Sequence, residues 1–264
     1  MTKCDSKTIM KNNKTILIAF ITFFFHSIAL AQDGMSIWYG HGAEARLTKE
    51  WRVSARQLFM FSGNPRKLSR IQNSLNVSYR YNKRVRLGFG YQLSVDPRDL
   101  GKQARSRLTG RVSYYTKWKG FRVMNTFRAE WHLPERSKFE YRLRYAMRIH
   151  PRNLDLPLRA RPFMTNEFHY YLSGDPLWYR DAEGERVVEQ SPNGLHAHRF
   201  TLGLRITPLK RTNLTMRFMR QTEFNLGSKY RRINVEDPRN GRIRRRFNNF
   251  SVFIVTVSHR LKLK

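Results

Sequence analysis

Polar and apolar residues alternate with a period of two along most of the chain, and this period is typical of β-strands with one apolar face. In residues 70–81, for example, Leu75 and Val77 lie on one face, and Asn76 and Ser78 lie on the other. The apolar face of such segments is aromatic and aliphatic, whereas the polar face is rich in arginine. The pattern therefore predicts an all-β fold with two chemically distinct faces.

The same alternation recurs in segments long enough to cross a bilayer as tilted strands. Short and long connections alternate between these segments, which is the habit of outer-membrane barrels, although the connection at 150–157 is longer than this rule expects. The predicted strands are residues 36–47, 51–61, 70–81, 85–94, 105–115, 121–132, 138–149, 158–172, 195–206, 213–224 and 247–261.

These eleven segments conflict with the even strand number that is normal for bacterial single-chain barrels. Either residues 36–47 do not form a full strand, or a further strand lies elsewhere, for example within residues 225–246. We therefore predict a closed antiparallel transmembrane β-barrel of about 10–12 strands with an arginine-rich lumen.

The first residues have the features of a secretory signal peptide. Four lysines precede the apolar run from Ile16 to Phe25, and the small residues Ala29 and Ala31 frame a cleavage site. We expect residues 1–31 to be cleaved and residues 32–264 to form the barrel domain. The single cysteine, Cys4, would leave with the signal peptide, so the mature domain would have no disulfide.

The net charge of +32 would by itself suggest a nucleic-acid partner. Removing residues 1–31 takes away four lysines and one aspartate, which leaves +29. The basic residues are spread through the strands and occupy one face of each, so we exclude nucleic acid as the partner of an exported chain. A soluble periplasmic β-protein that binds an acidic partner stays an alternative, but its polar faces would carry mixed charges.

In a barrel, the apolar faces would meet lipid and the basic faces would line the lumen, because a charge facing lipid at the midplane costs about 2–4 kcal/mol. Glu223 is a further candidate for a lumenal carboxylate. Two readings of this interior stay open: a lumen packed with hydrogen-bonded side chains, and an open anion-selective pore. The candidate lumen-lining residues are Arg105, Arg107, Arg111, Arg122, Arg128, Glu130, Glu140, Arg142, Arg144, Arg148 and Glu167.

The chain resembles an uncharacterised family of outer-membrane β-barrels, a domain of unknown function common in Bacteroidetes-type bacteria. The resemblance covers nearly the whole mature chain and implies a fold and a compartment, but no activity. The C-terminal Leu261-Lys262-Leu263-Lys264 departs from the usual barrel ending because it has no terminal aromatic residue. The features that carry the resemblance are Ile37-Trp38-Tyr39 with Trp51, Tyr79-Arg80-Tyr81, Leu87-Gly88-Phe89-Gly90-Tyr91, Phe127-Arg128-Ala129-Glu130, Phe139-Glu140-Tyr141-Arg142-Leu143-Arg144-Tyr145 and Asn166-Glu167-Phe168.

Acid–histidine pairs are the strongest catalytic candidates, since a histidine and a carboxylate can activate a serine. Glu130 shares a strand face with His132, and Glu167 shares one with His169, but no serine has a recognisable spacing to either pair. We interpret both pairs as members of an ion-pair network and predict no catalytic residues.

Signals for a metal or a cofactor are weak. His196 and His198 could face one metal ion, but no third ligand is evident nearby. Gly88 and Gly90 are interpreted as positions where bulky lumenal side chains approach a strand, and not as a phosphate-binding loop. The acidic residues within 173–194 are typical of a solvated loop, although such a cluster could bind a divalent cation. We predict no metal site and no cofactor.

Taken together, these observations favour a non-enzymatic outer-membrane barrel, acting as a small anion-preferring pore or as a structural protein. An outer-membrane lipid-modifying enzyme is the alternative. Membrane lipid and small anions are the expected partners, and the sequence predicts no oligomeric state.

Overall fold

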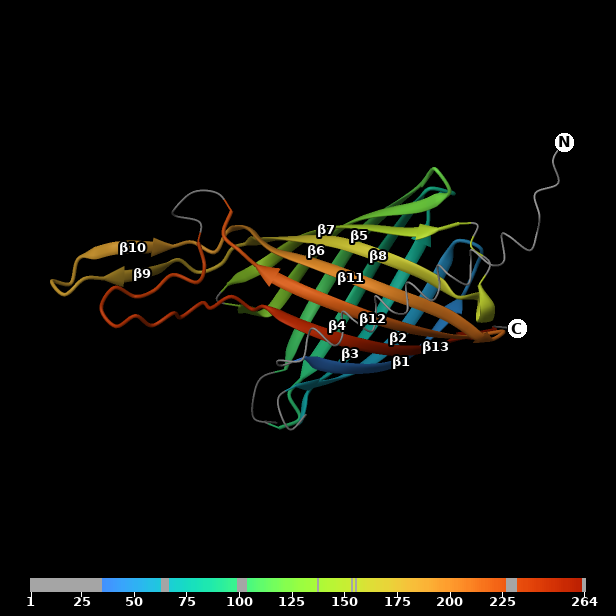
Figure 1. The fold of residues 1–264 in the computed structure, drawn as a ribbon, viewed down its shortest axis with the longest axis horizontal. Coiled ribbons are helices and arrows are strands. Elements are labelled where there is room, and N and C mark those ends of the chain that lie inside the picture. Colours follow the sequence, from blue (N-terminus) through green and yellow to red (C-terminus); the bar gives the residue numbers. More distant parts are fainter. Residues whose placement is uncertain are drawn as a thin grey trace.

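The computed structural model describes residues 35–62, 67–98, 104–136, 138–152, 154, 156–226 and 232–262. Eleven strands close into a barrel, and two further strands form a hairpin outside it (Figure 1). Around the barrel the order is β1-β13-β12-β11-β8-β7-β6-β5-β4-β3-β2, so most neighbours in space are also neighbours in the chain. The predicted signal peptide and its cleavage site lie outside the described residues.

Each barrel strand corresponds to one strand predicted from the alternation. The bounds differ by a few residues, mainly because ladder pairing continues beyond the alternating part of β3, β5, β6 and β11. The barrel strands are β1 (Ser36–Arg46), β2 (Trp51–Ser62), β3 (Lys67–Arg80), β4 (Val85–Val95), β5 (Arg105–Trp118), β6 (Phe121–Arg136), β7 (Phe139–Pro151), β8 (Arg161–Leu172), β11 (Gly194–Leu209), β12 (Thr212–Glu223) and β13 (Phe250–Leu261).

The barrel closes through a parallel pair, and this corrects the expectation of a wholly antiparallel barrel. β1 pairs with β13 in parallel, from Ser36 beside Val252 to Ala45 beside Leu261. All other neighbouring strands in the barrel are antiparallel. A closed meander with an odd number of strands must contain one parallel contact, because the first and last strands then run in the same direction. The count of eleven therefore needs no extra strand.

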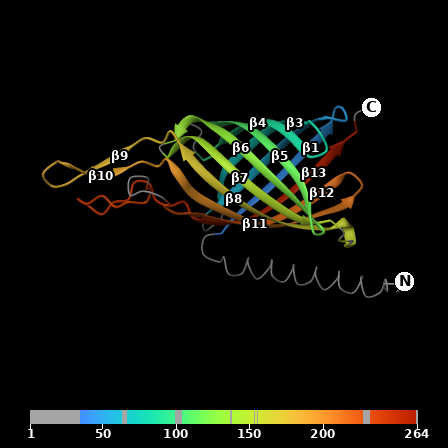
Figure 2. The same ribbon diagram turned by 90° about the horizontal axis from the view of Figure 1, so that it is seen from above.

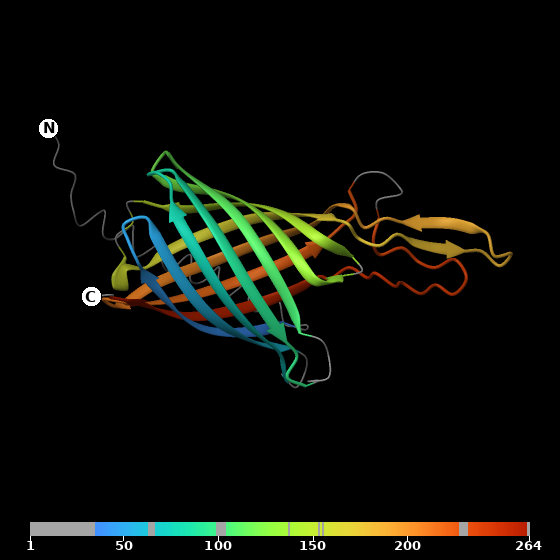
Figure 3. The same ribbon diagram turned by 180° about the vertical axis from the view of Figure 1, so that it is seen from behind.

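The connections separate the barrel into two ends. The turns between β1 and β2, β3 and β4, β5 and β6, and β11 and β12 are short and lie at the end that also holds the C-terminus (Figure 3). We call this the short-turn end, and the opposite one the long-loop end. β1 begins at the long-loop end, because it runs parallel to β13.

The long-loop end carries a projecting lobe, whereas the sequence predicts a solvated acidic loop there. β9 (Leu177–Arg180) and β10 (Arg186–Gln190) form a hairpin that extends beyond the barrel rim (Figures 1 and 2). Within 225–246, the described residues form no further strand and contain only an isolated bridge between Glu236 and Ile243. Buried Tyr179 donates a hydrogen bond to the carbonyl of Val235, which holds the two loops together.

The longer connection between β7 and β8 lies at the short-turn end and contains a 3₁₀ turn, η1 (Pro157–Arg159). Its buried residues Leu156 and Ala160 pack against Leu204, whose side chain points out of β11. The segment needs its extra length to reach this outer face. Among the described residues, no helix has the length and apolar character needed to cross a membrane.

The two faces of the wall differ as the alternation predicts. Large apolar side chains on the outward face are exposed, among them Leu75, Phe89, Phe127 and Leu143. The inward face contains most of the buried charged residues, including Glu130, Arg142, Arg144 and Glu167. The polar core of this protein is therefore the lumen of the barrel.

Candidate functional site

Cross-strand pairing brings inward-facing charges together in the wall formed by β6, β7 and β8. Glu130 lies beside Arg142, and Arg128 lies beside Arg144. Arg144 in turn lies beside His169, two residues after Glu167. Because side chains opposite one another on one face of a sheet are close neighbours, this register builds a network of ion pairs inside the barrel.

Glu130 is the centre of this network and is 2 % exposed. Its carboxylate accepts hydrogen bonds from Arg142 Nε at 2.7 Å and from Arg144 Nη1 at 2.7 Å. Arg107 approaches it to 3.4 Å from β5. A carboxylate removed from water needs such partners, and here several arginines compete for one acid.

Glu167 holds the second half of the network. It accepts a hydrogen bond from Arg144 Nη2 at 2.5 Å and lies 2.6 Å from His169 Nε2. Arg199 reaches the same oxygen from β11 at 3.4 Å. Arg144 therefore bridges the two carboxylates. We use the name ion-pair network for Arg107, Arg128, Glu130, Arg142, Arg144, Glu167, His169 and Arg199.

The network continues toward the long-loop end around Glu223. This carboxylate accepts hydrogen bonds from Tyr171 Oη at 2.8 Å and from Lys138 Nζ at 2.8 Å. Glu140 lies apart from these groups, since it accepts a hydrogen bond from the indole of exposed Trp131. Glu140, which the sequence predicts to line the lumen, therefore lies outside the network.

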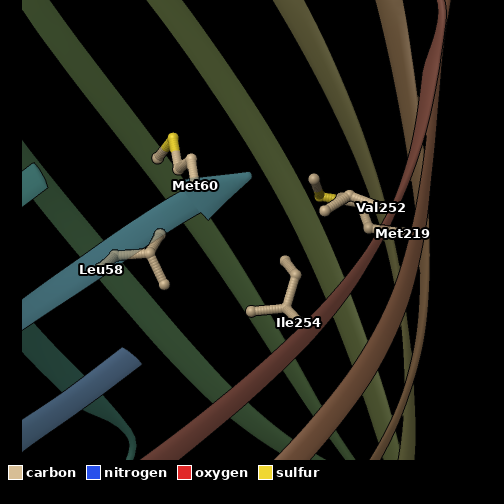
Figure 4. Packing of buried hydrophobic residues seen from close by; sticks show 5 residues of the cluster. All are labelled: Leu58, Met60, Met219, Val252 and Ile254. Carbon is tan, nitrogen blue, oxygen red and sulfur yellow. The ribbon is translucent and has the colours of Figure 1, made fainter. Parts of the chain in front are cut away.

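An apolar patch covers the opposite wall of the same half of the lumen. It consists of Leu58, Met60, Met219, Val252 and Ile254, whose side chains gather between β2, β12 and β13 (Figure 4). Val252 is 0 % and Ile254 is 4 % exposed. With the ion-pair network on one wall and the apolar patch on the other, packed side chains occupy the long-loop half of the lumen.

The short-turn half is different, because several of its inward-facing arginines remain exposed to solvent. Arg56, Arg122, Arg161 and Arg205 are all exposed although they point inward. Among the described residues, the inward strand faces of this half carry one carboxylate, Glu44. It forms an ion pair with Arg52 at 3.0 Å. We call this half the basic chamber. Its lining includes Arg46, Arg52, Arg56, Arg80, Arg86, Arg111, Lys117, Arg122, Arg148, Arg161, Arg205, Arg217 and Arg260.

The residues predicted from sequence thus separate into groups. Arg107, Arg128, Glu130, Arg142, Arg144 and Glu167 meet in the ion-pair network, whereas Arg111, Arg122 and Arg148 line the basic chamber. Arg105 is exposed at the start of β5, at the long-loop end. The sequence prediction left out Arg56, Arg199, Arg205 and Arg217, although the alternation within their own strands points to the same inward face.

Glycines let bulky lumenal side chains lie against the wall, as interpreted for Gly88. A Cβ at Gly88 would overlap the side chain of Arg111, which lies flat over it. A Cβ at Gly203 would overlap the ring of Phe163 in the same way. Phe163 in turn carries the guanidinium of Arg148, 4.7 Å from its ring centroid. These glycines therefore fix where two arginines of the basic chamber lie.

The two histidines of the possible metal pair point to different places. A bulge between Leu195 and Ala197 shifts the register of β11. His196 is buried and its Nδ1 lies 3.1 Å from the carbonyl of Phe224, whereas His198 lies 3.2 Å from Asn166 Oδ1. Among the described residues, no group of three histidine, cysteine, aspartate or glutamate side chains is arranged to hold a metal ion.

A family model described as "Protein of unknown function (DUF2490)" matches residues 35–232, which is most of the barrel. The chain belongs to this family. No curated protein matches the chain. The match begins one residue before β1 and ends within the long connection that precedes β13.

Two solved barrels are similar in structure at low sequence identity. LpxR from Salmonella typhimurium is 14% identical over 72% of this chain and 83% of that chain, with a TM-score of 0.46. The anion-selective porin from Comamonas acidovorans is 11% identical over 78% of this chain, with a TM-score of 0.30. This chain spans 52% of the porin's length.

Proposed function

We propose that this DUF2490 protein is a bacterial outer-membrane β-barrel that takes up small anions in its basic chamber and performs no catalysis. One observation carries the proposal: the basic chamber holds a large excess of accessible arginines over carboxylates. Guanidinium groups that are not neutralised by protein need water or anions as partners. A lumen of this charge would attract anions and repel cations.

The membrane part of the proposal rests on the outward face. Exposed apolar and aromatic side chains such as Leu75, Phe89, Trp118 and Phe127 cover it, as expected for a surface in contact with lipid. Arg220, the charge that breaks the apolar pattern of β12, lies near the long-loop end and donates a hydrogen bond to Ser251. The predicted signal peptide supports export. Because the short turns of outer-membrane barrels lie on the periplasmic side, the short-turn end would face the periplasm.

The packed long-loop half makes the proposed uptake one-sided. The buried ion-pair network and the buried apolar patch leave the basic chamber open toward the short turns. We therefore expect a wild-type barrel with little through-conductance. The observations do not favour an enzyme, because Glu167 already binds two arginines and neither Glu167 nor His169 bonds a serine or cysteine in the described part of the chain.

Membrane fractionation tests the compartment. We expect the protein to stay in the outer-membrane pellet after a carbonate wash and to migrate faster on a gel before heating than after it. Release by carbonate would instead support a soluble periplasmic protein.

Planar-bilayer recording tests the anion preference. A variant with Leu58→Ala, Met60→Ala and Met219→Ala should conduct more than the wild type, because it removes much of the apolar patch. Its reversal potential under a potassium chloride gradient should show preference for chloride, since the remaining lining is basic. The outward-facing Leu75→Ala serves as the control and should behave like the wild type. A cation-preferring current in the triple variant would contradict the proposal.

A further inference from the structure

Four arginines of the basic chamber come from strands that are distributed around the whole barrel. They are Arg56 on β2, Arg111 on β5, Arg148 on β7 and Arg217 on β12. β1 and β13 separate β2 from β12, and β11 and β8 separate β12 from β7. β6 separates β7 from β5, and β4 and β3 complete the circle. The cross-strand register points all four side chains into the lumen.

The electrostatics agree with this convergence. The charge of Arg56 acts on Arg111, Arg148 and Arg217, and the charge of Arg148 acts on Arg217 as well. Arg56, on β2, is therefore within electrostatic range of the other three. Positive charges gathered in this way repel one another unless an anion lies among them.

Among the described residues, protein carboxylates do not supply that anion. Glu44 and Glu167 are the acids whose charges reach Arg56 and Arg148. Glu44 already pairs with Arg52, and Glu167 pairs with Arg144 and Arg199. Within the described residues, none of the four arginines forms an ion pair, and the buried Nε of Arg217 has no hydrogen-bond partner.

Two of the four side chains are held in place by their surroundings. Arg148 Nε donates a hydrogen bond to Thr165 Oγ1 at 3.1 Å, and its guanidinium stacks on Phe163. Arg111 lies over Gly88, where any larger residue would displace it. Arginines with fixed positions lose less freedom when they bind a ligand.

We propose that Arg56, Arg111, Arg148 and Arg217 form a binding site for one compact divalent oxyanion of the phosphate type. A tetrahedral oxyanion offers oxygens in several directions, and each planar guanidinium can donate two parallel hydrogen bonds to it. The site rests on the proposed uptake of anions and narrows it from anions in general to one ligand class.

Calorimetric titration of the folded barrel in detergent tests the site, with inorganic phosphate as the probe and chloride at equal ionic strength as the reference. We expect saturable binding of one phosphate and none of chloride. Arg217→Gln and Arg56→Gln should each weaken phosphate binding about tenfold or more, the loss typical of a charge-assisted hydrogen bond. Arg105→Gln is the matched control, since Arg105 lies at the long-loop end outside the basic chamber, and it should change binding less than about twofold.

Thermal unfolding in phosphate-free buffer gives a second readout that does not depend on detecting the ligand. Arg56→Gln and Arg217→Gln should raise the melting temperature there, because each removes one repelling charge, and phosphate should stabilise the wild type more than either variant. Absence of saturable phosphate binding by the folded wild type, or equal weakening by Arg105→Gln, would overturn the site. A chloride preference of the triple variant in bilayers would not be affected by that result. The proposed anion uptake and the proposed oxyanion site can therefore fail separately.

The phosphoryl group could come from free phosphate or from the headgroup of a membrane lipid. Glucosamine 1-phosphate, a soluble phosphorylated sugar, separates the two sources. If glucosamine 1-phosphate competes with inorganic phosphate for the same site, the oxyanion site would be supported with a lipid headgroup as its ligand. Phosphate binding without such competition would support the site with free phosphate as its ligand.

Discussion

At the residue scale, the interior of this barrel is organised by too few carboxylates for too many arginines. Glu130 and Glu167 each bind more than one arginine, and Arg144 is shared between them. Each acid therefore fixes several side chains at once. A buried charge that loses its partner is costly, so the acids should matter more for stability than any single arginine around them.

Replacing Glu130 tests this dependence. Glu130→Gln leaves Arg142 and Arg144 buried without their shared carboxylate, so we expect a loss of about 3–5 kcal/mol in unfolding free energy. Urea unfolding of the folded barrel in detergent, followed by gel mobility, measures it. Glu140→Gln is the control, because the carboxylate of Glu140 accepts its hydrogen bond from an exposed indole, and it should cost less than about 1 kcal/mol. Equal losses in the two variants would mean that the ion-pair network does not stabilise the barrel.

At the scale of elements, the parallel contact between β1 and β13 distinguishes this barrel from the usual bacterial pattern. The contact extends along nearly the full length of β1, so it is a regular ladder and not a local crossing. Parallel pairing is slightly less stable per residue than antiparallel pairing, which makes this seam the weaker joint of the wall.

Cysteine cross-linking tests the seam. Ala43 lies beside His259 in the observed register, and both side chains point outward. In a Cys4→Ser background, Ala43→Cys with His259→Cys should oxidise to a disulfide that alters the mobility of the heated protein. Ala43→Cys with Val255→Cys is the control, because those positions are four residues out of register and should remain reduced. Cross-linking of only the control pair would show that the strands close differently.

At the scale of the whole molecule, the odd strand number places the two ends of the barrel domain on opposite sides. β1 begins at the long-loop end, and β13 ends at the short-turn end. If the long loops face the outside of the cell, Ser36 lies outside and Lys262 lies in the periplasm. The projecting lobe of β9 and β10 would lie on the same side as Ser36 (Figure 1).

Labelling of intact cells with a membrane-impermeant maleimide tests this topology. Ser36→Cys should react in whole cells, as should Arg98→Cys in a long loop. Lys262→Cys should react only after permeabilisation, like Lys83→Cys in a short turn. Protection of Ser36→Cys in whole cells, with Arg98→Cys still labelled, would indicate an even number of spanning strands.

The sequence by itself determined the strands and their two faces. Period-two alternation is a local property of the sequence. The requirements to hydrogen-bond the polar backbone and to separate charged from apolar side chains act on each strand. For this reason Glu130, Arg142 and Glu167 could be assigned to one face before their neighbours were known, and the interpretation of Gly88 beside a bulky arginine is confirmed by the position of Arg111.

Only the tertiary structure decided what those faces meet. Pairing of the first strand with the last depends on closure of the whole ring, so no local pattern could show that β1 and β13 run in parallel. The division of the lumen into a packed half and a basic chamber depends on which residues of strands far apart in the chain meet, such as Met60 and Val252 in the apolar patch. The alternation placed the charges inside the barrel, and ring closure determined which of them are neutralised and which remain available to an anion.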